Sequence, residues 1–297
     1  MNQGRHVKIG LAQLTRKLGD KHENVARGSA FVREAAEKGA TLVILPELFN
    51  TGMVATDVYD QERLGWAETT DGESISAMCA LAQELSVAII APIFEFEPEG
   101  TMWFNTAVVI DETGQVVGKY RKRHIPIIPR QLEKAYFSPG DIFYRVFDVA
   151  GCKLGVLICY DRHFPESFRH LALQGAEVVA VVSNTPTEFS GKNWIPEMHV
   201  NAVANGCFIV QVNASGKEED IPWFGRSAVV SPRGDVLLEM GSEPGVEVVE
   251  LPLGEIEIVR RHYATLRDVR AEDFVGSVPE LPRHAEQAAT PGKASRG

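Results

Sequence analysis

The stretch KLGVLICYDRHFPE, residues 153–166, decides the fold class of this chain. Its first part is an apolar run typical of a β-strand in a protein core, and the run ends at Cys159. A helical pattern follows near Pro165–Gln174, so a strand passes through a reactive side chain into a helix. This order is typical of α/β enzymes, in which functional groups gather at the carboxyl ends of strands.

Two further segments share this design. The stretch TLVILPELF (41–49) is a β-branched and leucine run broken by Pro46, which predicts a buried strand that delivers Glu47. The stretch GQVVGKYRK (114–122) is a strand pattern that ends at Lys122. A carboxylate, an ammonium group and a thiol brought together at strand ends would supply a base, an oxyanion stabiliser and a nucleophile.

Strand and helix patterns alternate in pairs along the rest of the chain, with hairpins between them. Helices are expected near Asn24–Lys38, Ser74–Leu85, Pro165–Gln174 and Ile195–Asn205. Strands are expected at Val7–Gln13, Thr41–Leu45, Val87–Phe94, Phe104–Ile110, Gln115–Tyr120, Tyr144–Val149, Lys153–Cys159, Glu177–Ser183, Phe208–Asn213, Ser227–Ser231, Val236–Glu239 and Val246–Leu251. The mixture predicts two sheets covered by helices in one layered α/β domain, residues 1–278, and a Pro-, Ala- and Gly-rich tail, residues 279–297.

Three sequence blocks resemble the signature blocks of a known family. PELF (46–49), YRKRHIP (120–126) and CYDRHFPE (159–166) are similar, in order and spacing, to those of the nitrilase superfamily of carbon–nitrogen hydrolases. The resemblance runs from about Val7 to Leu251. It implies a four-layer αββα sandwich of two mixed sheets flanked by helices, and a homodimer or larger homo-oligomer.

The same resemblance implies a catalytic triad of Glu47, Lys122 and Cys159, with Glu133 as an auxiliary carboxylate. Glu133 lies in the segment LEKAYFSPGD, within an irregular stretch whose length is typical of functional loops. Glu47 could take the thiol proton and return it to the departing nitrogen, while Lys122 and the backbone N–H of Tyr160 could hold the oxyanion. Taken alone, Glu47 and Lys122 are better explained as surface charges and Cys159 as a buried structural thiol.

The residues after the nucleophile suggest an acidic substrate. The guanidinium of Arg162 could bind a substrate carboxylate through two hydrogen bonds. Superfamily members that hydrolyse N-carbamoyl amino acids or N-carbamoyl-β-alanine carry Arg at this position. Members that act on carbamoylputrescine tend to carry a neutral residue there. The loop SNTPTEF (183–189) resembles that of N-carbamoyl-D-amino-acid hydrolases, which makes Asn184 and Thr185 candidate substrate contacts. His163 stands where that pattern usually has a second Arg, and CYxRH looks more like β-ureidopropionase.

These patterns leave alternatives open. Arg162 could instead serve a surface or subunit contact, and Asn184 and Thr185 could serve a turn. An amidase or nitrilase acting on a neutral carboxamide, a nitrile or N-carbamoylputrescine, and a non-catalytic scaffold, are the rival functions. The enantiomer, the chain length of the acid and the pathway stay undetermined. Aromatic and apolar residues that could line a pocket, or simply pack in the core, are Met53, Trp103, Phe137, Trp194 and Trp223.

Composition narrows the partners and the compartment. Thirty Lys and Arg against forty Asp and Glu give a net charge of −10, which disfavours nucleic-acid binding. The chain has no signal-peptide pattern and no apolar run of about 20 residues, so a cytoplasmic protein that does not cross a membrane is expected. Neither H-E-x-x-H nor a Gly-rich phosphate loop occurs, so no metal and no cofactor are predicted. Three cysteines are interpreted as structural: Cys79, Cys152 and Cys207.

Overall fold

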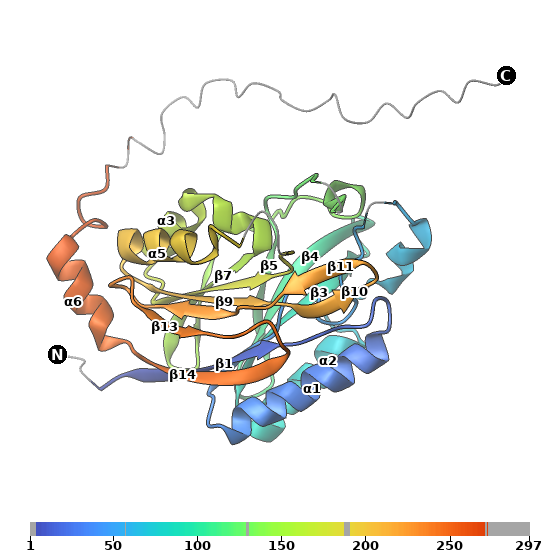
Figure 1. Cartoon of the computed structure of the whole chain (residues 1–297), viewed down its shortest axis with the longest axis horizontal. Coiled ribbons are helices and arrows are strands. Elements are labelled where there is room, and N and C mark those ends of the chain that lie inside the picture. Colours follow the sequence, from blue (N-terminus) through green and yellow to red (C-terminus); the bar gives the residue numbers. More distant parts are fainter. Residues whose placement is uncertain (1–3, 57, 129–130, 187–190, 271, 273–297) are drawn as a thin grey trace. The chain divides into compact units, whose positions relative to one another are not determined.

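The computed structural model describes residues 4–56, 58–128, 131–186, 191–270 and 272 (Figure 1). The chain divides into two compact units, Met1–Leu266 and Arg267–Gly297. All helices and strands named below belong to the first unit. The predicted boundary between residues 278 and 279 lies outside the described residues and stays a prediction.

The first sheet has the strand order β14-β1-β2-β3-β4-β5. Parallel pairs join β1 to β2 and β2 to β3, whereas β14–β1, β3–β4 and β4–β5 are antiparallel, so the sheet is mixed. Its strands are β1 (His6–Gln13), β2 (Leu42–Ile44), β3 (Ala88–Glu97), β4 (Met102–Ile110), β5 (Val116–Arg121) and β14 (Gly245–Pro252).

The second sheet repeats this plan with the order β13-β12-β9-β8-β7-β6. Its three central strands β7, β8 and β9 are parallel, and antiparallel strands flank them on both sides. The strands are β6 (Val146–Val149), β7 (Cys152–Ile158), β8 (Val178–Ser183), β9 (Phe208–Asn213), β12 (Ala228–Val230) and β13 (Val236–Glu239). A separate antiparallel hairpin consists of β10 (Ser215–Glu218) and β11 (Ile221–Phe224).

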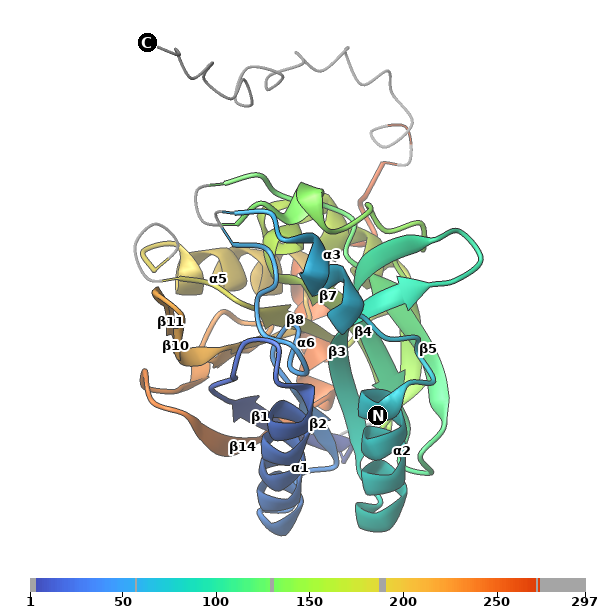
Figure 2. The same cartoon turned by 90° about the vertical axis from the view of Figure 1, so that its right-hand side faces the viewer.

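Helices cover the outer face of each sheet. Figures 1 and 2 show α1 and α2 side by side on the first sheet and α3 and α5 on the second, which confirms the predicted αββα sandwich. The helices are α1 (Lys21–Glu37), α2 (Glu73–Leu85), α3 (Pro165–Leu173), α5 (Trp194–Asn205) and α6 (Gly254–Tyr263), with short 3₁₀ turns η1 (Gln61–Trp66), η2 (Glu133–Ala135) and η3 (Cys159–His163). The Asp20 side chain caps α1 by accepting the Glu23 N–H.

The continuous apolar runs of the central strands have a geometric reason. Successive side chains of a strand point to opposite faces. Leu42 and Ile44 of β2 therefore join the core between the two sheets, whereas Val43 joins the core beneath α1 and α2. Burial of each such side chain contributes about 1.5–3 kcal/mol, so both faces of these strands stabilise the fold.

Several predicted boundaries were wrong, and some elements were missed. The β7 strand ends at Ile158, so Cys159 begins η3 instead of ending a strand. The four residues of β10 are mostly polar, and the four-residue apolar strand β11 contains Pro222, so neither shows a clear strand pattern in the sequence. The helix α6 buries only Ile256 and Val259, a stripe too narrow to reveal its periodicity. In the described ranges, no helix is long and apolar enough to cross a bilayer.

Candidate active site

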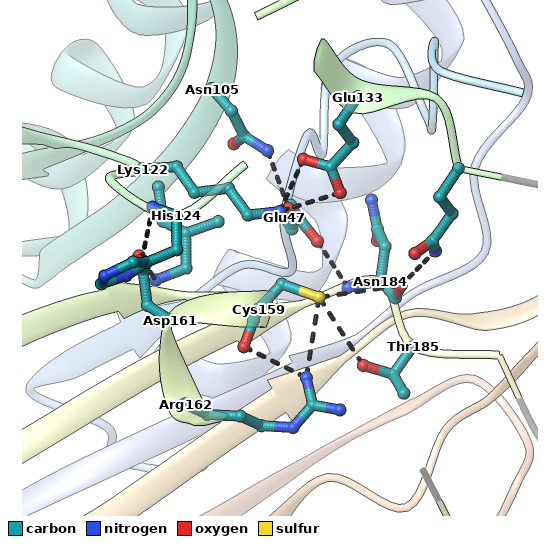
Figure 3. Close-up of polar contacts among 12 residues, drawn as sticks. Glu47, Asn105, Lys122, His124, Glu133, Cys159, Asp161, Arg162, Asn184 and Thr185 are labelled. Carbon is teal, nitrogen blue, oxygen red and sulfur yellow. Dashed lines mark hydrogen bonds and ion pairs between the residues drawn. The ribbon is translucent and has the colours of Figure 1, made fainter. Parts of the chain in front are cut away.

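Five segments from the two sheets deliver polar side chains of the site (Figure 3). In the first sheet, Glu47 follows β2, Asn105 lies within β4, and Lys122 comes directly after β5. In the second sheet, Cys159 follows β7, and the loop after β8 contributes Asn184. The strand ends therefore meet at one edge of the sandwich, as the sequence predicted.

A buried ion cluster forms the first half of the site. Lys122 Nζ donates to Glu47 Oε1 at 2.9 Å and to the two carboxylate oxygens of Glu133 at 2.9 and 2.7 Å. All three side chains are fully buried. Glu47 also accepts hydrogen bonds from Asn105 Nδ2 and from the backbone N–H of Asn184, both at 2.7 Å. Each carboxylate oxygen of Glu47 thus has a fixed donor.

One ammonium group and two carboxylates leave this cluster with an excess negative charge. Burial alone lowers the pKa of Lys122, but Glu133 and Glu47 outweigh it, so the pKa is raised and the amine stays charged. Burial raises the pKa of Glu133, and the charge of Glu47 acts in the same direction, while Lys122 opposes both. A proton taken up in this cluster is therefore retained more readily than on an exposed carboxylate.

Cys159 sits at a strained turn between β7 and η3. Its φ of +46° lies in the left-handed region, which is costly for a residue with a side chain and must be maintained by the surrounding structure. The Sγ atom lies 3.7 Å from Thr185 Oγ1 and 3.9 Å from the Asn184 carbonyl oxygen. Burial, reinforced by the charge of Glu47, raises the pKa of Cys159 to about 11. The resting thiol is protonated at neutral pH, so it needs a base to react.

Arg162 approaches the thiol from the side opposite the ion cluster. Its Nη1 donates to the Cys159 carbonyl oxygen at 3.1 Å and lies 3.7 Å from Sγ. Its Nε donates to Glu197 Oε2 at 3.2 Å, and Glu197 Oε1 lies 2.8 Å from His163 Nδ1. Arg162 therefore lies at the reacting atom but already has a carboxylate partner, which the sequence did not reveal. His163 contacts Glu197 rather than the thiol.

The remaining predicted contacts lie around the sulfur. Tyr160 follows the nucleophile in the first turn of η3, where backbone N–H groups have no carbonyl partner inside the helix. The backbone N–H of Thr185 donates to Asn213 Oδ1 at 2.8 Å, which fixes the loop that carries the Thr185 hydroxyl. The structure describes all nine site residues proposed from the sequence. It places seven of them next to Cys159 or in the ion cluster, and His163 contacts the site only through Glu197.

Comparison with known proteins identifies the family. A family model described as "Carbon-nitrogen hydrolase" matches residues 8–261. The chain belongs to the carbon–nitrogen hydrolase family. Curated relatives of this hydrolase include a "Nitrilase" of Pyrococcus abyssi, 34% identical over 82% of this chain and 87% of that protein. An "N-carbamoylputrescine amidase" of Solanum lycopersicum is 35% identical over 85% of this chain and 89% of that protein.

A "Citrullinase" of Francisella tularensis is 30% identical over 90% of this chain and 96% of that protein. Among solved structures, a carbon–nitrogen hydrolase of Helicobacter pylori G27 superposes with a TM-score of 0.84 at 29% identity, covering 91% of this chain and 97% of that chain. The names of these relatives differ in their substrates, so they identify the family and not the compound that this hydrolase cleaves.

Sequence reasoning overlooked several residues that hold the hydrolase site together. Asp161 accepts from the Ile158 N–H (3.2 Å), the Tyr120 hydroxyl (2.8 Å) and the His124 N–H (3.0 Å), and lies 2.7 Å from His124 Nδ1. It thus ties the nucleophile turn to the segment of Lys122. A buried acid two residues after the nucleophile was a signal in the quoted block, as was Asn105 inside an apolar strand.

Arg16 was also overlooked. Its guanidinium is buried and hydrogen-bonds to the Glu47 carbonyl oxygen and to Asn184 Oδ1, and it forms an ion pair with Glu218. These contacts join β1, the Glu47 turn and the β10–β11 hairpin of the hydrolase. The sequence around Arg16 is polar and carried no signal of burial.

The other cysteines and aromatic residues have different surroundings. Burial raises the pKa of Cys152 and of Cys207 to about 12. The charges that act on Cys152 are those of Glu177, Arg5 and Asp148, and those that act on Cys207 belong to Arg260 and Arg169. Met53, Phe137 and Trp223 share an apolar cluster against which Trp103 packs, whereas Trp194 lies beneath Arg162. Within the described ranges, no group of three or more His, Cys, Asp or Glu residues is placed to hold a metal ion.

Proposed function

We propose that this carbon–nitrogen hydrolase cleaves the ureido group of an N-carbamoyl acid and uses Cys159 as its nucleophile. The observation that carries the reaction is the Glu47–Lys122–Glu133 ion cluster beside a protonated thiol. Glu47 takes the thiol proton as Sγ attacks the ureido carbonyl. The carbonyl oxygen becomes an oxyanion, which Lys122 Nζ and the Tyr160 N–H stabilise; losing one such donor typically costs about 3 kcal/mol.

Collapse of the oxyanion breaks the bond to the terminal nitrogen. Ammonia is a poor leaving group unless protonated, and Glu47 returns the proton to it. Water then attacks the S-carbamoyl intermediate, with Glu47 or Glu133 accepting its proton, and releases the thiol and a carbamic acid. The carbamic acid splits into carbon dioxide and the amino acid. No redox partner or cofactor is needed for this sequence.

Support for an acidic substrate comes from Arg162. Its guanidinium lies 3.7 Å from Sγ, so a carboxylate bound to it would sit within a few bonds of the reacting carbonyl. Asn184 and Thr185, on the opposite loop, complete the proposed substrate contacts. Because a guanidinium binds a carboxylate through two parallel hydrogen bonds, Arg162 also orients the substrate.

A second candidate is hydrolysis of a neutral amide or of N-carbamoylputrescine. Glu197 already balances the charge of Arg162, which weakens the attraction for a substrate acid and favours a neutral or cationic substrate. The name of the Solanum lycopersicum relative points to a cationic ureido compound without a carboxylate, N-carbamoylputrescine. This candidate uses the same four residues Glu47, Lys122, Glu133 and Cys159.

A substrate panel separates the two candidates. Ammonia release is measured with N-carbamoyl-β-alanine, N-carbamoyl-D- and L-amino acids, N-carbamoylputrescine and simple amides. Arg162→Ala should raise KM for the acids by about tenfold or more and leave KM for neutral amides nearly unchanged, with Arg162→Lys as the charge-retaining control. Turnover of only neutral or cationic compounds refutes the acid substrate. Loss of turnover of every substrate in Cys159→Ala supports Cys159 as the nucleophile, whichever substrate is cleaved.

We also propose that the enzyme works as a homodimer or larger homo-oligomer without a metal or cofactor. This proposal is supported by the resemblance of the three sequence blocks to the superfamily. Light scattering after size exclusion measures the oligomeric state, and activity after exhaustive dialysis against a chelator checks the independence from metals.

A further inference from the structure

The first turn of α5 holds the guanidinium of Arg162 on two sides. The ring of Trp194 lies beneath it, with the guanidinium carbon 5.3 Å from the ring centroid. Glu197 binds its edge through Nε at 3.2 Å. Residues three apart on a helix share a face, which is why these two side chains can reach the same group. Figure 3 shows the other end of the guanidinium directed at Cys159.

Glu197 divides its two oxygens between successive residues of η3. One oxygen binds Arg162 and the other lies 2.8 Å from His163 Nδ1. The Arg162 side chain is only 3% exposed, whereas that of Glu197 is 26% exposed. A buried positive charge at the thiol is thus balanced from one side by a carboxylate at the rim of the site, and this carboxylate does not contact the sulfur.

We infer that Glu197 is a specificity-determining residue: it sets how much of the positive charge of Arg162 acts on the substrate and on Cys159. The inference rests on the proposed function, because it deepens the question of which charged substrate the site accepts. Lys122 is paired with two carboxylates, whereas Arg162 Nη1 lies 3.7 Å from Sγ and Arg162 has one carboxylate partner, Glu197. Changing the counter-charge of Arg162 therefore changes the charge preference of the site.

A role in charge and a purely structural role for Glu197 predict different effects of two substitutions, Glu197→Gln and Glu197→Asp. Glu197→Gln keeps the length and the hydrogen bonding to Arg162 but removes the charge. Glu197→Asp keeps the charge but shortens the side chain. If Glu197 acts through its charge, Glu197→Gln changes the thiol pKa and the substrate preference, whereas Glu197→Asp retains the wild-type values of both. If it acts by shape alone, Asp is the more damaging substitution.

Titration of the Cys159 thiol measures this charge without any turnover. Burial has the largest effect on the thiol pKa and raises it. Four charged groups also act on the pKa: Glu47 and Glu133 raise it, whereas Lys122 and Arg162 lower it. Removing the Glu197 charge leaves the Arg162 charge less opposed, so Glu197→Gln should lower the thiol pKa by about half to one unit, allowing for the partial exposure of Glu197. The pKa is read from the pH dependence of iodoacetamide alkylation of Cys159, followed by peptide mass spectrometry.

Matched controls complete this titration. Glu255→Gln removes the same charge from a surface pair with Arg233 and should leave the thiol pKa unchanged. Glu197→Asp should also retain the wild-type value. A thiol pKa in Glu197→Gln equal to that of wild type overturns the inference, as does an equal fall in Glu255→Gln.

Substrate preference provides the second readout. The ratio of kcat/KM for N-carbamoyl-β-alanine to that for N-carbamoylputrescine should rise about three- to tenfold in Glu197→Gln and stay unchanged in Glu197→Asp. An unchanged or lower ratio in Glu197→Gln overturns the inference. If wild type hydrolyses no N-carbamoyl acid, the proposed function fails by itself. The thiol titration then decides the inference alone, because it needs no substrate.

Discussion

Glu47→Gln should lower kcat and at the same time make the Cys159 thiol more acidic, because Glu47 is both the proposed base and a negative charge close to the thiol. Glu47 accepts hydrogen bonds from Asn105, Lys122 and the Asn184 N–H, so glutamine fills the same space but offers one oxygen where three donors converge. One donor is left facing an amide N–H₂ group, which should lower the free energy of unfolding by about 1–3 kcal/mol. Lys122 keeps Glu133 as its partner, so the ion cluster survives.

The effects of Glu47→Gln on kcat and on the pKa of Cys159 should be larger than its effect on stability. Without a base for the thiol and an acid for the leaving nitrogen, kcat should fall by a factor of about 10²–10⁴. The thiol itself should become more acidic, because Glu47 is a negative charge that, next to burial, keeps the pKa of Cys159 at about 11. Removing a like charge at this range typically shifts a pKa by about 1–3 units.

The size of the effect on alkylation follows from these values. With a pKa of about 11, roughly one thiol in ten thousand is ionised at pH 7. A fall of about two units raises that fraction roughly a hundredfold, and the weaker nucleophilicity of a more acidic thiolate cancels about half of the gain on a logarithmic scale. Iodoacetamide should therefore modify Cys159 about tenfold faster in Glu47→Gln at pH 7, while ammonia release nearly disappears.

The assay combines steady-state ammonia release with the pH dependence of alkylation at Cys159, both corrected for the folded fraction. Glu68→Gln is the matched control, since Glu68 is a buried carboxylate that accepts from Asn50 and the Ser74 N–H outside the site. It should lower stability without changing the thiol pKa. A loss in kcat of less than about tenfold, or a thiol pKa that stays at its wild-type value in Glu47→Gln, refutes the assigned role of Glu47.

Three further outcomes are expected. Asp161→Asn replaces an oxygen that accepts two hydrogen bonds by an amide N–H₂ group, so urea titration should show a loss of about 1–3 kcal/mol and kcat should fall with it. Gly140→Ala would put a methyl group 2.1 Å from the Arg121 carbonyl oxygen, so it should displace the adjoining Lys122, lower Tm and reduce kcat. Replacing Cys152 with Ala should leave kcat and the rate of alkylation at Cys159 unchanged, which peptide mapping checks.

Much of the fold could be predicted because it depends on local pattern. The runs at residues 42–45 and 154–158 contain no polar side chain, and only a strand buried on both faces requires that. The hairpin of β10 and β11 and the helix α6 could not be predicted in this way. The strand β10 is mostly polar, β11 is short and interrupted by Pro222, and α6 buries only two of its side chains, so the stability of both elements comes from contacts that are distant in sequence.

The site residues also differ in how far a local sequence pattern could predict them. Cys159, Glu47 and Lys122 were recognisable because each ends or follows an apolar strand within a family-like block. Glu133 was recognisable only through the resemblance, because it lies in an irregular stretch with no period. Asp161 and Asn105 were visible as polar residues beside apolar ones, but nothing local indicated which groups they would bind.

The sequence by itself determined which reactive groups stand at the strand ends and in what order, because strand periodicity places a residue without reference to the rest of the chain. Only the tertiary structure decided how those groups share charge. Glu47 receives the N–H of Asn184, 137 residues away, and Lys122, 75 residues from Glu47, divides its charge between two carboxylates. The sequence places Arg162 three residues after the nucleophile, yet the balance of its charge depends on Glu197, which α5 brings to it. Such electrostatic balances arise from distances in space, which no local pattern encodes.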